Sequence, residues 1–195
     1  MNTQRSLKVV ITGGPGGGKT TAIDLFRREL CGKVSVVSEA ATLIFASGIE
    51  RTDSEEVVRA TQKAIFNLQK DMETIVSVQH PERLLICDRG TLDGLAYWPG
   101  TEEEFFATMH SSYEEELSRY DAVIFFETGA ASGNDISSNN PYRNEDAQKA
   151  IELDKKLQAV WSKHPKFSLV SSNESFVKKI MYGIMSIENV INSIK

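Results

Sequence analysis

The chain has 195 residues, a formal net charge of −5, and 41% hydrophobic and 25% charged residues, which excludes a disordered or fibrous protein. This acidic balance argues against nucleic acid as a partner, because non-specific binding to phosphate backbones needs a basic surface. Two cysteines, three isolated histidines and no apolar run of about 20 residues exclude a disulfide framework, a metal-ligand cluster and membrane insertion, so we expect a cytoplasmic location.

Five short apolar runs predict buried strands. They are rich in Val, Ile, Leu and Phe without strict alternation, as expected for strands that are covered on both faces. The runs are Leu7–Thr12, Val34–Ser38, Arg83–Cys87, Ala122–Glu127 and Phe167–Ser171. Because helical patterns lie between them, the sequence predicts one α/β domain over residues 1–195, with three layers: a five-stranded parallel sheet and helices on both faces.

Apolar residues at helical spacing predict four helices. The stripes comprise Ile23, Phe26 and Leu30; Ile65, Leu68, Met72, Ile75 and Val76; Ala147, Ile151, Leu157, Val160 and Trp161; and Phe176, Ile180, Ile184, Ile187 and Ile191. The second stripe lies within Glu55 to Gln79, and Pro165 is expected to stop the third helix.

Two residue pairs have the spacing of a capping box, which marks the start of a helix. These pairs are Asp53 with Glu56 and Thr101 with Glu104. The acidic run Glu114–Glu116 is expected to be a solvated helix face near another helix start.

The first strand is followed by a run of glycines that ends in Lys19-Thr20. Gly13-Gly14-Pro15-Gly16-Gly17-Gly18-Lys19-Thr20 matches the Walker A pattern G-x(4)-G-K-[ST] in full. Glycines allow backbone N–H groups to approach phosphate oxygens, and the N-terminus of the following helix attracts the same anion. We therefore expect residues Gly13 to Thr20, together with Thr21, to bind ATP, or less readily GTP, with the Lys19 ammonium on the outer phosphates.

The third predicted strand ends in Asp88-Arg89-Gly90. A carboxylate at the end of a strand beside the phosphate-loop strand reaches the magnesium region, so Asp88 and the Thr20 hydroxyl are the candidate Mg²⁺ ligands. Arg89 is a candidate to clamp the phosphoryl group in transit. An Asp–Arg pair that merely caps the following turn is the alternative reading.

Glu39 follows the second strand, so its carboxylate is expected at the same sheet edge as the phosphate loop. It is a candidate to hold or deprotonate a substrate hydroxyl. A surface glutamate is the alternative reading of this residue.

Residues 128–145 are rich in Gly, Ser, Asn and Pro and show no periodicity. A loop of this length inside a compact domain is usually functional or disordered. We expect a lid that closes over the triphosphate, with Arg143 neutralising the charge that develops during transfer.

These features together resemble the layout of P-loop nucleoside and nucleotide kinases. Within them, the chain is most similar to a small ATP-binding group that includes nicotinamide-riboside-kinase-like domains and is often labelled AAA-type ATPase-like. Ser38-Glu39-Ala40-Ala41, Phe66-Asn67-Leu68-Gln69 and Asn140-Pro141-Tyr142-Arg143-Asn144-Glu145 contribute to this resemblance. It implies that Glu39 is the base, that Asp88 and Arg89 serve Mg²⁺ and the transferred group, and that Gln69 binds an acceptor ring. The chain has Asp-Arg-Gly where deoxynucleoside kinases typically have Glu-Arg-Ser.

The favoured function is transfer of the γ-phosphoryl group of Mg-ATP to a small acceptor: a nucleoside, a nucleotide or a riboside-like molecule. Thr91, Asp93, Tyr97 and Trp98 are candidates to line the acceptor pocket, although a core position suits Trp98 equally well. The alternative is a regulatory GTPase-like switch with a protein or lipid partner. A mechanical AAA ATPase is disfavoured, because Arg89 stands where such enzymes carry a water-activating glutamate. A homodimer is left open.

Overall fold

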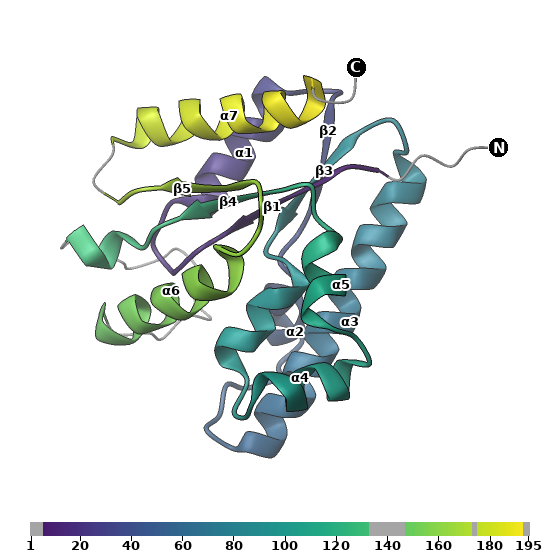
Figure 1. Ribbon diagram of the computed structural model, residues 1–195, viewed down its shortest axis with the longest axis vertical. Helices are drawn as coiled ribbons and strands as arrows, with labels where there is room; N and C mark the ends of the chain where they lie inside the picture. Colours follow the sequence, from purple (N-terminus) through teal and green to yellow (C-terminus); the bar gives the residue numbers. More distant parts are fainter. Residues whose placement is uncertain (1–5, 133–146, 173–174, 193–195) are drawn as a thin grey trace.

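The computed structural model describes residues 6–132, 147–172 and 175–192, which form a sheet of five parallel strands between two layers of helices (Figure 1). The strands are β1 (Lys8–Thr12), β2 (Val34–Val37), β3 (Leu84–Asp88), β4 (Ala122–Phe126) and β5 (Phe167–Val170). The helices are α1 (Lys19–Glu29), α2 (Ala40–Ala46), α3 (Glu55–Gln79), α4 (Glu102–Met109), α5 (Tyr113–Ser118), α6 (Ala147–Trp161) and α7 (Phe176–Asn192), with short 3-10 helices η1 (Thr91–Tyr97) and η2 (Gly129–Ser132). The predicted parallel sheet, covered on both faces, is confirmed.

Two hydrophobic clusters fill the space on either side of the sheet. Val9 and Ile11 of β1 point to one side, where Phe26 of α1 and Ile187 of α7 cover them. Val10, between them in the sequence, points to the other side, where α3, α4 and α6 pack. The central strands β1, β3 and β4 are buried on both faces and have no reason to alternate apolar and polar residues, which explains their continuous apolar runs.

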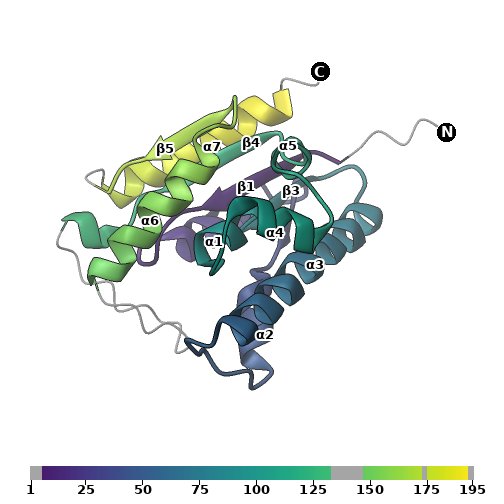
Figure 2. The same ribbon diagram turned by 60° about the horizontal axis from the view of Figure 1, so that its bottom comes forward.

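The strand order β2-β3-β1-β4-β5 determines where a ligand can bind. The chain crosses from β1 to β2, returns to β3, and then continues on the other side of β1. Ligands of such sheets bind beyond the carboxyl ends of the strands, at the point where the order reverses. This point lies beside the carboxyl end of β1, from which the glycine-rich loop leads into α1. Helix α2, which follows β2, packs against α3 (Figure 2).

The two predicted capping boxes have different outcomes. The Thr101 hydroxyl accepts from the Glu104 N–H, and the Glu104 carboxylate accepts from the Thr101 N–H, so this box is confirmed. The box at Asp53 is wrong, because α3 begins after Ser54 and neither pattern residue is its N-cap.

Two predictions about helix faces hold only in part: Glu114 and Glu115 are exposed as predicted, and Met72 and Val76 of the α3 stripe pack against the core, but Glu116 and Ile75 differ. Glu116 is buried rather than solvated, since its carboxylate pairs with Lys70 and Arg119 of neighbouring elements. In α3, Ile75 is 54% exposed, while the most buried side chains are largely polar. These buried residues are Thr61, Gln62, Phe66, Gln69 and Glu73.

The predicted lid largely lies outside the described residues, because residues 133–146 include Arg143 and most of the segment. The lid and the single-domain organisation of residues 1–195 therefore stay predictions. Within the described ranges, no helix is both long and apolar enough to cross a membrane.

Candidate active site at the carboxyl edge of the sheet

The glycine-rich loop is folded closely against β4. Gly13 has a φ of 126°, and a Cβ atom there would lie 2.0 Å from the carbonyl oxygen of Phe126. No other residue type fits this position, because both the backbone conformation and the available space exclude a side chain. Gly16 and Gly18 also have positive φ angles, of 70° and 87°. The loop thus has the tight glycine turns that a phosphate-binding loop requires.

Lys19 opens α1 and is buried, with its Nζ donating to the carbonyl oxygen of Gly14 at 2.5 Å. Thr20 and Thr21 follow it in the first turn of α1 and are exposed. The ammonium group therefore lies inside the loop, while the Thr20 hydroxyl is available at its mouth.

Asp154 of α6 holds the loop from the other side. Its Oδ1 accepts from the N–H of Gly14 at 2.6 Å and from the N–H of Thr128 at 3.0 Å. The Thr128 hydroxyl in turn donates to the carbonyl oxygen of Pro15 at 2.6 Å. Burial raises the pKa of the Asp154 carboxyl, an effect that these two backbone N–H donors and Lys19 oppose. Sequence reasoning missed this residue, because it lies 140 residues from its partner within an ordinary helical pattern.

Arg89 extends from the end of β3 to the same loop. Its Nη1 donates to the carbonyl oxygen of Gly13 at 2.6 Å, and it forms ion pairs with Asp93 at 3.2 Å and Glu39 at 3.3 Å. Burial alone would lower the pKa of this guanidinium, but Tyr97, Asp93 and Glu39 raise it above its ordinary value. Arg89 is therefore a fixed positive charge between the phosphate loop and the start of α2.

Asp93 in η1 connects the strands and helices around this arginine. Its carboxylate accepts from the Thr12 hydroxyl at 2.8 Å and from the indole N–H of Trp161 at 2.7 Å, in addition to its ion pair with Arg89. Because these donors come from β1 and α6, Asp93 ties the phosphate-loop strand to the Arg89 turn.

Glu39, the N-cap residue of α2, has a side chain that is 16% exposed. Its Oε1 pairs with Arg89, while its Oε2 accepts from the Thr42 hydroxyl at 2.6 Å. The structure thus brings three predicted site elements together: Glu39, Arg89 and the phosphate loop.

Asp88 is the last residue of β3, lies opposite Ile11 of β1 and is partly buried. No group of three or more His, Cys, Asp or Glu side chains that could hold a metal ion occurs in the described part of the chain. Mg²⁺ typically takes only one or two protein oxygens and completes its shell with water and phosphate. The exposed Thr20 hydroxyl and the Asp88 carboxylate are hard oxygen donors, so they fit that requirement.

A cavity begins at Glu39 and Arg89 and runs between α2, α3 and η1. Its lining comprises Glu39, Ala40, Ala41, Phe45, Arg51, Gln62, Ile65, Phe66, Gln69, Arg89, Gly90, Thr91, Asp93, Gly94 and Tyr97. The predicted residues Gln69, Thr91, Asp93 and Tyr97 are therefore part of it. Trp98 is not, because its ring packs in the core at 5.4 Å from the Phe105 ring.

The amide nitrogen of Gln69 has two partners already: the carbonyl oxygen of Arg89 at 3.3 Å and the Glu73 carboxylate at 3.2 Å. Gln62, two turns earlier on the same face of α3, also lines the cavity and was not singled out from the sequence. The only signal that could have found it was the spacing of seven residues between the two glutamines.

Comparison with known proteins agrees with this description. The family model described as "AAA domain" matches residues 8–175. The solved structure of deoxyadenosine kinase from M. mycoides, with bound dATP, superposes with a TM-score of 0.64 at 13% sequence identity, covering 93% of this chain and 99% of that one. No curated protein sequence gives a significant match.

The chain has a P-loop NTPase fold, which it shares with that kinase. The chain belongs to the AAA-domain family, over a stretch that includes the phosphate loop, Glu39 and Arg89. The predicted fold class and the resemblance to P-loop kinases are thus confirmed.

Proposed function

We propose that this protein is an ATP-dependent phosphotransferase that transfers the γ-phosphoryl group of Mg-ATP to a hydroxyl of a small, ring-containing acceptor. The observation that carries the proposal is the position of Arg89, which contacts the phosphate loop at Gly13 and also lines the adjoining cavity. A phosphoryl group that leaves the loop toward the cavity would pass this guanidinium. Its charge is fixed and largely desolvated, as stabilisation of a transferred phosphoryl group requires.

The lining of the cavity supports an acceptor of the nucleoside, nucleotide or riboside type. Phe45, Phe66 and Tyr97 supply aromatic surface, on which a planar ring packs favourably. Gln62 adds an amide that both donates and accepts hydrogen bonds, which matches the edge of a heterocyclic ring. The fold shared with a deoxyadenosine kinase is consistent with a kinase.

In the proposed reaction, the acceptor hydroxyl oxygen attacks the γ-phosphorus in line with the β–γ bridging oxygen. The new O–P bond forms as the P–O bond to the bridging oxygen breaks. The electron pair of the broken bond stays on that oxygen, which leaves as part of ADP. Glu39 takes the hydroxyl proton, since its carboxylate lies at the start of the cavity. Lys19 and Arg89 neutralise the charge that spreads over the phosphoryl oxygens.

Thr20 and Asp88 would hold Mg²⁺. When bound, this ion supplies positive charge to the β- and γ-phosphates. Arg143, in the proposed lid, would add a further positive charge on closure and help to exclude water.

A motor or switch protein is less well supported. In a mechanical ATPase the acid at the end of the Walker B strand is followed by a glutamate that activates water, whereas Asp88 is followed by Arg89. A switch needs an exposed surface that changes with the nucleotide, whereas the space beyond this phosphate loop is a recessed, aromatic-lined cavity. The cytoplasmic location and the homodimer considered from the sequence stay predictions.

The test is a transfer assay with Mg-ATP and a panel of nucleosides, nucleotides and ribosides, read by chromatography of the phosphorylated product. We expect ADP to appear in equal amount with one phosphorylated acceptor. In Glu39→Gln, kcat should fall about 100-fold or more, because the base is lost. The matched control is Glu29→Gln, which changes an exposed carboxylate at the end of α1. Slow hydrolysis of ATP with no phosphorylated acceptor would instead favour the switch.

A further inference from the structure

The turn that carries Arg89 has an unfavourable backbone conformation. Arg89 has a φ of 75°, in the left-handed region that residues other than glycine rarely adopt. The next residue, Gly90, is packed so closely that a Cβ atom would lie 2.7 Å from the Trp161 ring. Such strained segments persist only where surrounding contacts hold them.

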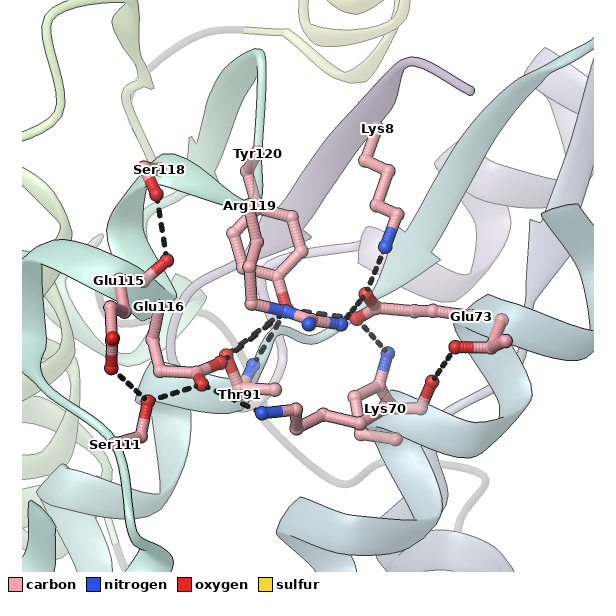
Figure 3. Close-up of polar contacts among 12 residues, drawn as sticks. Lys8, Lys70, Glu73, Thr91, Ser111, Glu115, Glu116, Ser118, Arg119 and Tyr120 are labelled. Carbon is pink, nitrogen blue, oxygen red and sulfur yellow. Dashed lines mark hydrogen bonds and ion pairs between the residues drawn. The ribbon is translucent and has the colours of Figure 1, made fainter. Parts of the chain in front are cut away.

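Two side chains hold this turn from the side away from the phosphate loop. The amide nitrogen of Gln69 donates to the carbonyl oxygen of Arg89 at 3.3 Å. The Tyr120 hydroxyl accepts from the N–H of Thr91 at 2.9 Å. Together these bonds fix the backbone on both sides of Gly90, and Tyr120, Thr91 and their neighbours are drawn in Figure 3.

Both of these side chains converge on one carboxylate oxygen. Glu73 Oε1 accepts from the Gln69 amide at 3.2 Å and from the Tyr120 hydroxyl at 2.8 Å. The hydroxyl of Tyr120 donates its single proton to this carboxylate. The lone pairs of the hydroxyl oxygen are therefore available to accept from the N–H of Thr91. The Gln69 NH₂ group has two hydrogens, one for Glu73 and one for Arg89. The negative charge of Glu73 therefore makes the Tyr120 hydroxyl an acceptor toward the turn and keeps the Gln69 amide nitrogen facing the turn as a donor.

Glu73 is ionised although it is completely buried. Its Oε2 accepts from Lys8 Nζ at 2.9 Å and from Arg119 at 2.6 Å (Figure 3). Burial alone would raise the pKa of Glu73, but Lys8 and Arg119 lower it below its ordinary value. Burial and the adjacent Glu73 charge raise the pKa of Tyr120 well above its ordinary value, so its proton stays in place.

We propose that Glu73 is a positioning residue for phosphoryl transfer: through Gln69 and Tyr120, its carboxylate holds the left-handed Arg89 turn in the geometry that directs the guanidinium at the phosphate loop. The expected change in kcat rests on the proposed function, in which Arg89 stabilises the transferred phosphoryl group. Glu73 is not itself a lining residue of the cavity; its polar partners are Lys8, Gln69, Arg119 and Tyr120, of which only Gln69 lines the cavity and none belongs to the phosphate loop.

The inference is tested with Tyr120→Phe and Glu73→Gln. Tyr120→Phe removes the contacts of the Tyr120 hydroxyl with the N–H and the hydroxyl of Thr91, and it leaves the Glu73 ion pairs intact, so it should fold. Glu73→Gln removes the orienting charge and is checked by its thermal unfolding. For each variant we expect exchange of the Thr91 amide hydrogen, followed by NMR, to be about tenfold faster or more, together with a shifted Arg89 Nε–H resonance. We also expect kcat to fall about tenfold while the KM for ATP changes less than about twofold.

The chain offers two matched controls. Tyr113→Phe changes another buried tyrosine, whose hydroxyl donates to the Val160 carbonyl oxygen away from the turn. Glu116→Gln changes another buried carboxylate, which pairs with Lys70 and shares Arg119 with Glu73; Glu73 keeps its shorter Arg119 contact and its Lys8 pair in this variant. Both controls should leave Thr91 exchange, the Arg89 resonance and kcat at the wild-type values.

The outcomes separate this inference from the proposed function. Unchanged Thr91 exchange in Tyr120→Phe overturns the inference, and so does faster exchange without any fall in kcat in an active enzyme. Equal effects in the controls overturn it as well, because they would indicate general loosening. If the wild-type protein phosphorylates no acceptor, the proposed function fails. The Thr91 exchange and the Arg89 resonance then decide alone whether Glu73 holds the turn.

Discussion

The two backbone polar groups of Gly14 are both held by buried charged side chains. Lys19 donates to its carbonyl oxygen, and Asp154 accepts from its N–H. The phosphate loop is thus fixed by one cation and one anion of the protein itself. Of these two side chains, only Lys19 can attract a triphosphate. Substitution of Lys19 should therefore lower activity, whereas substitution of Asp154 should lower stability.

For Lys19→Ala we expect phosphoryl transfer to fall by about 100-fold or more, because the charge that stabilises the transferred group is lost. The far-UV circular dichroism spectrum should not change, since α1 retains its other residues. Lys33→Ala, an exposed lysine before β2, is the control. Activity in Lys19→Ala equal to that of the wild type would remove this residue from the mechanism.

For Asp154→Ala we expect a loss of about 1–3 kcal/mol in the free energy of unfolding, because the amides of Gly14 and Thr128 lose their acceptor. Asp154→Asn should lose much less, since its amide oxygen can accept both bonds. Urea denaturation of the two variants measures the difference. Equal losses would mean that the charge of Asp154, rather than its hydrogen bonds, holds the loop.

Among the helices, α3 is unusual because most of its buried side chains are polar. Its buried face carries Gln62, Gln69 and Glu73 beside the core residue Phe66, because part of this face lines the cavity and supports the Arg89 turn. The apolar stripe read from the sequence lies beside this face and is only partly buried. A search for apolar periodicity therefore identifies the helix correctly but finds its buried face only in part: Met72 and Val76 pack against the core, whereas Ile75 is exposed.

The position of Gln62 in α3 leads to a prediction about substrate binding. For Gln62→Leu we expect the KM for the acceptor to rise about tenfold, because a polar ring edge would lose its hydrogen-bonding partner in a buried cavity. The KM for ATP should stay within about twofold. Gln79→Leu, at the exposed end of α3, is the control. An equal rise in both KM values would argue that Gln62 supports the fold of the site rather than the acceptor.

At the scale of the whole molecule, the buried charge of Glu73 makes stability depend on pH. The folded-state pKa lies below the ordinary value of 4.5, so its stabilising effect is complete above that pH and is lost as the pH falls through the lowered value. The difference in unfolding free energy between the wild type and Glu73→Gln should therefore shrink below about pH 4.5. Denaturant titrations from pH 7 to pH 3 measure it. A difference that is constant over this range would contradict ion pairing of Glu73.

The sequence predicts the sheet well, because strands covered on both faces must be continuously apolar. Each predicted strand end lies within one residue of the structure. The phosphate loop and the positions of Glu39 and Arg89 beside it follow from the Walker A pattern and from the rule that ligands bind at the carboxyl edge. Glu73, Glu116 and Asp154 could not be found in this way. In the sequence, a buried, paired carboxylate cannot be told from a surface carboxylate, because its partners are far away along the chain.

The bond from the Trp161 indole to Asp93 also has an optical consequence. Asp93 contacts Arg89 as well, so any shift of that guanidinium toward a nucleotide alters the electric field at the indole ring. The emission wavelength of an indole is sensitive to such fields. Trp161, separated from the arginine by a single carboxylate group, is thus a built-in fluorescent reporter of movement of that side chain.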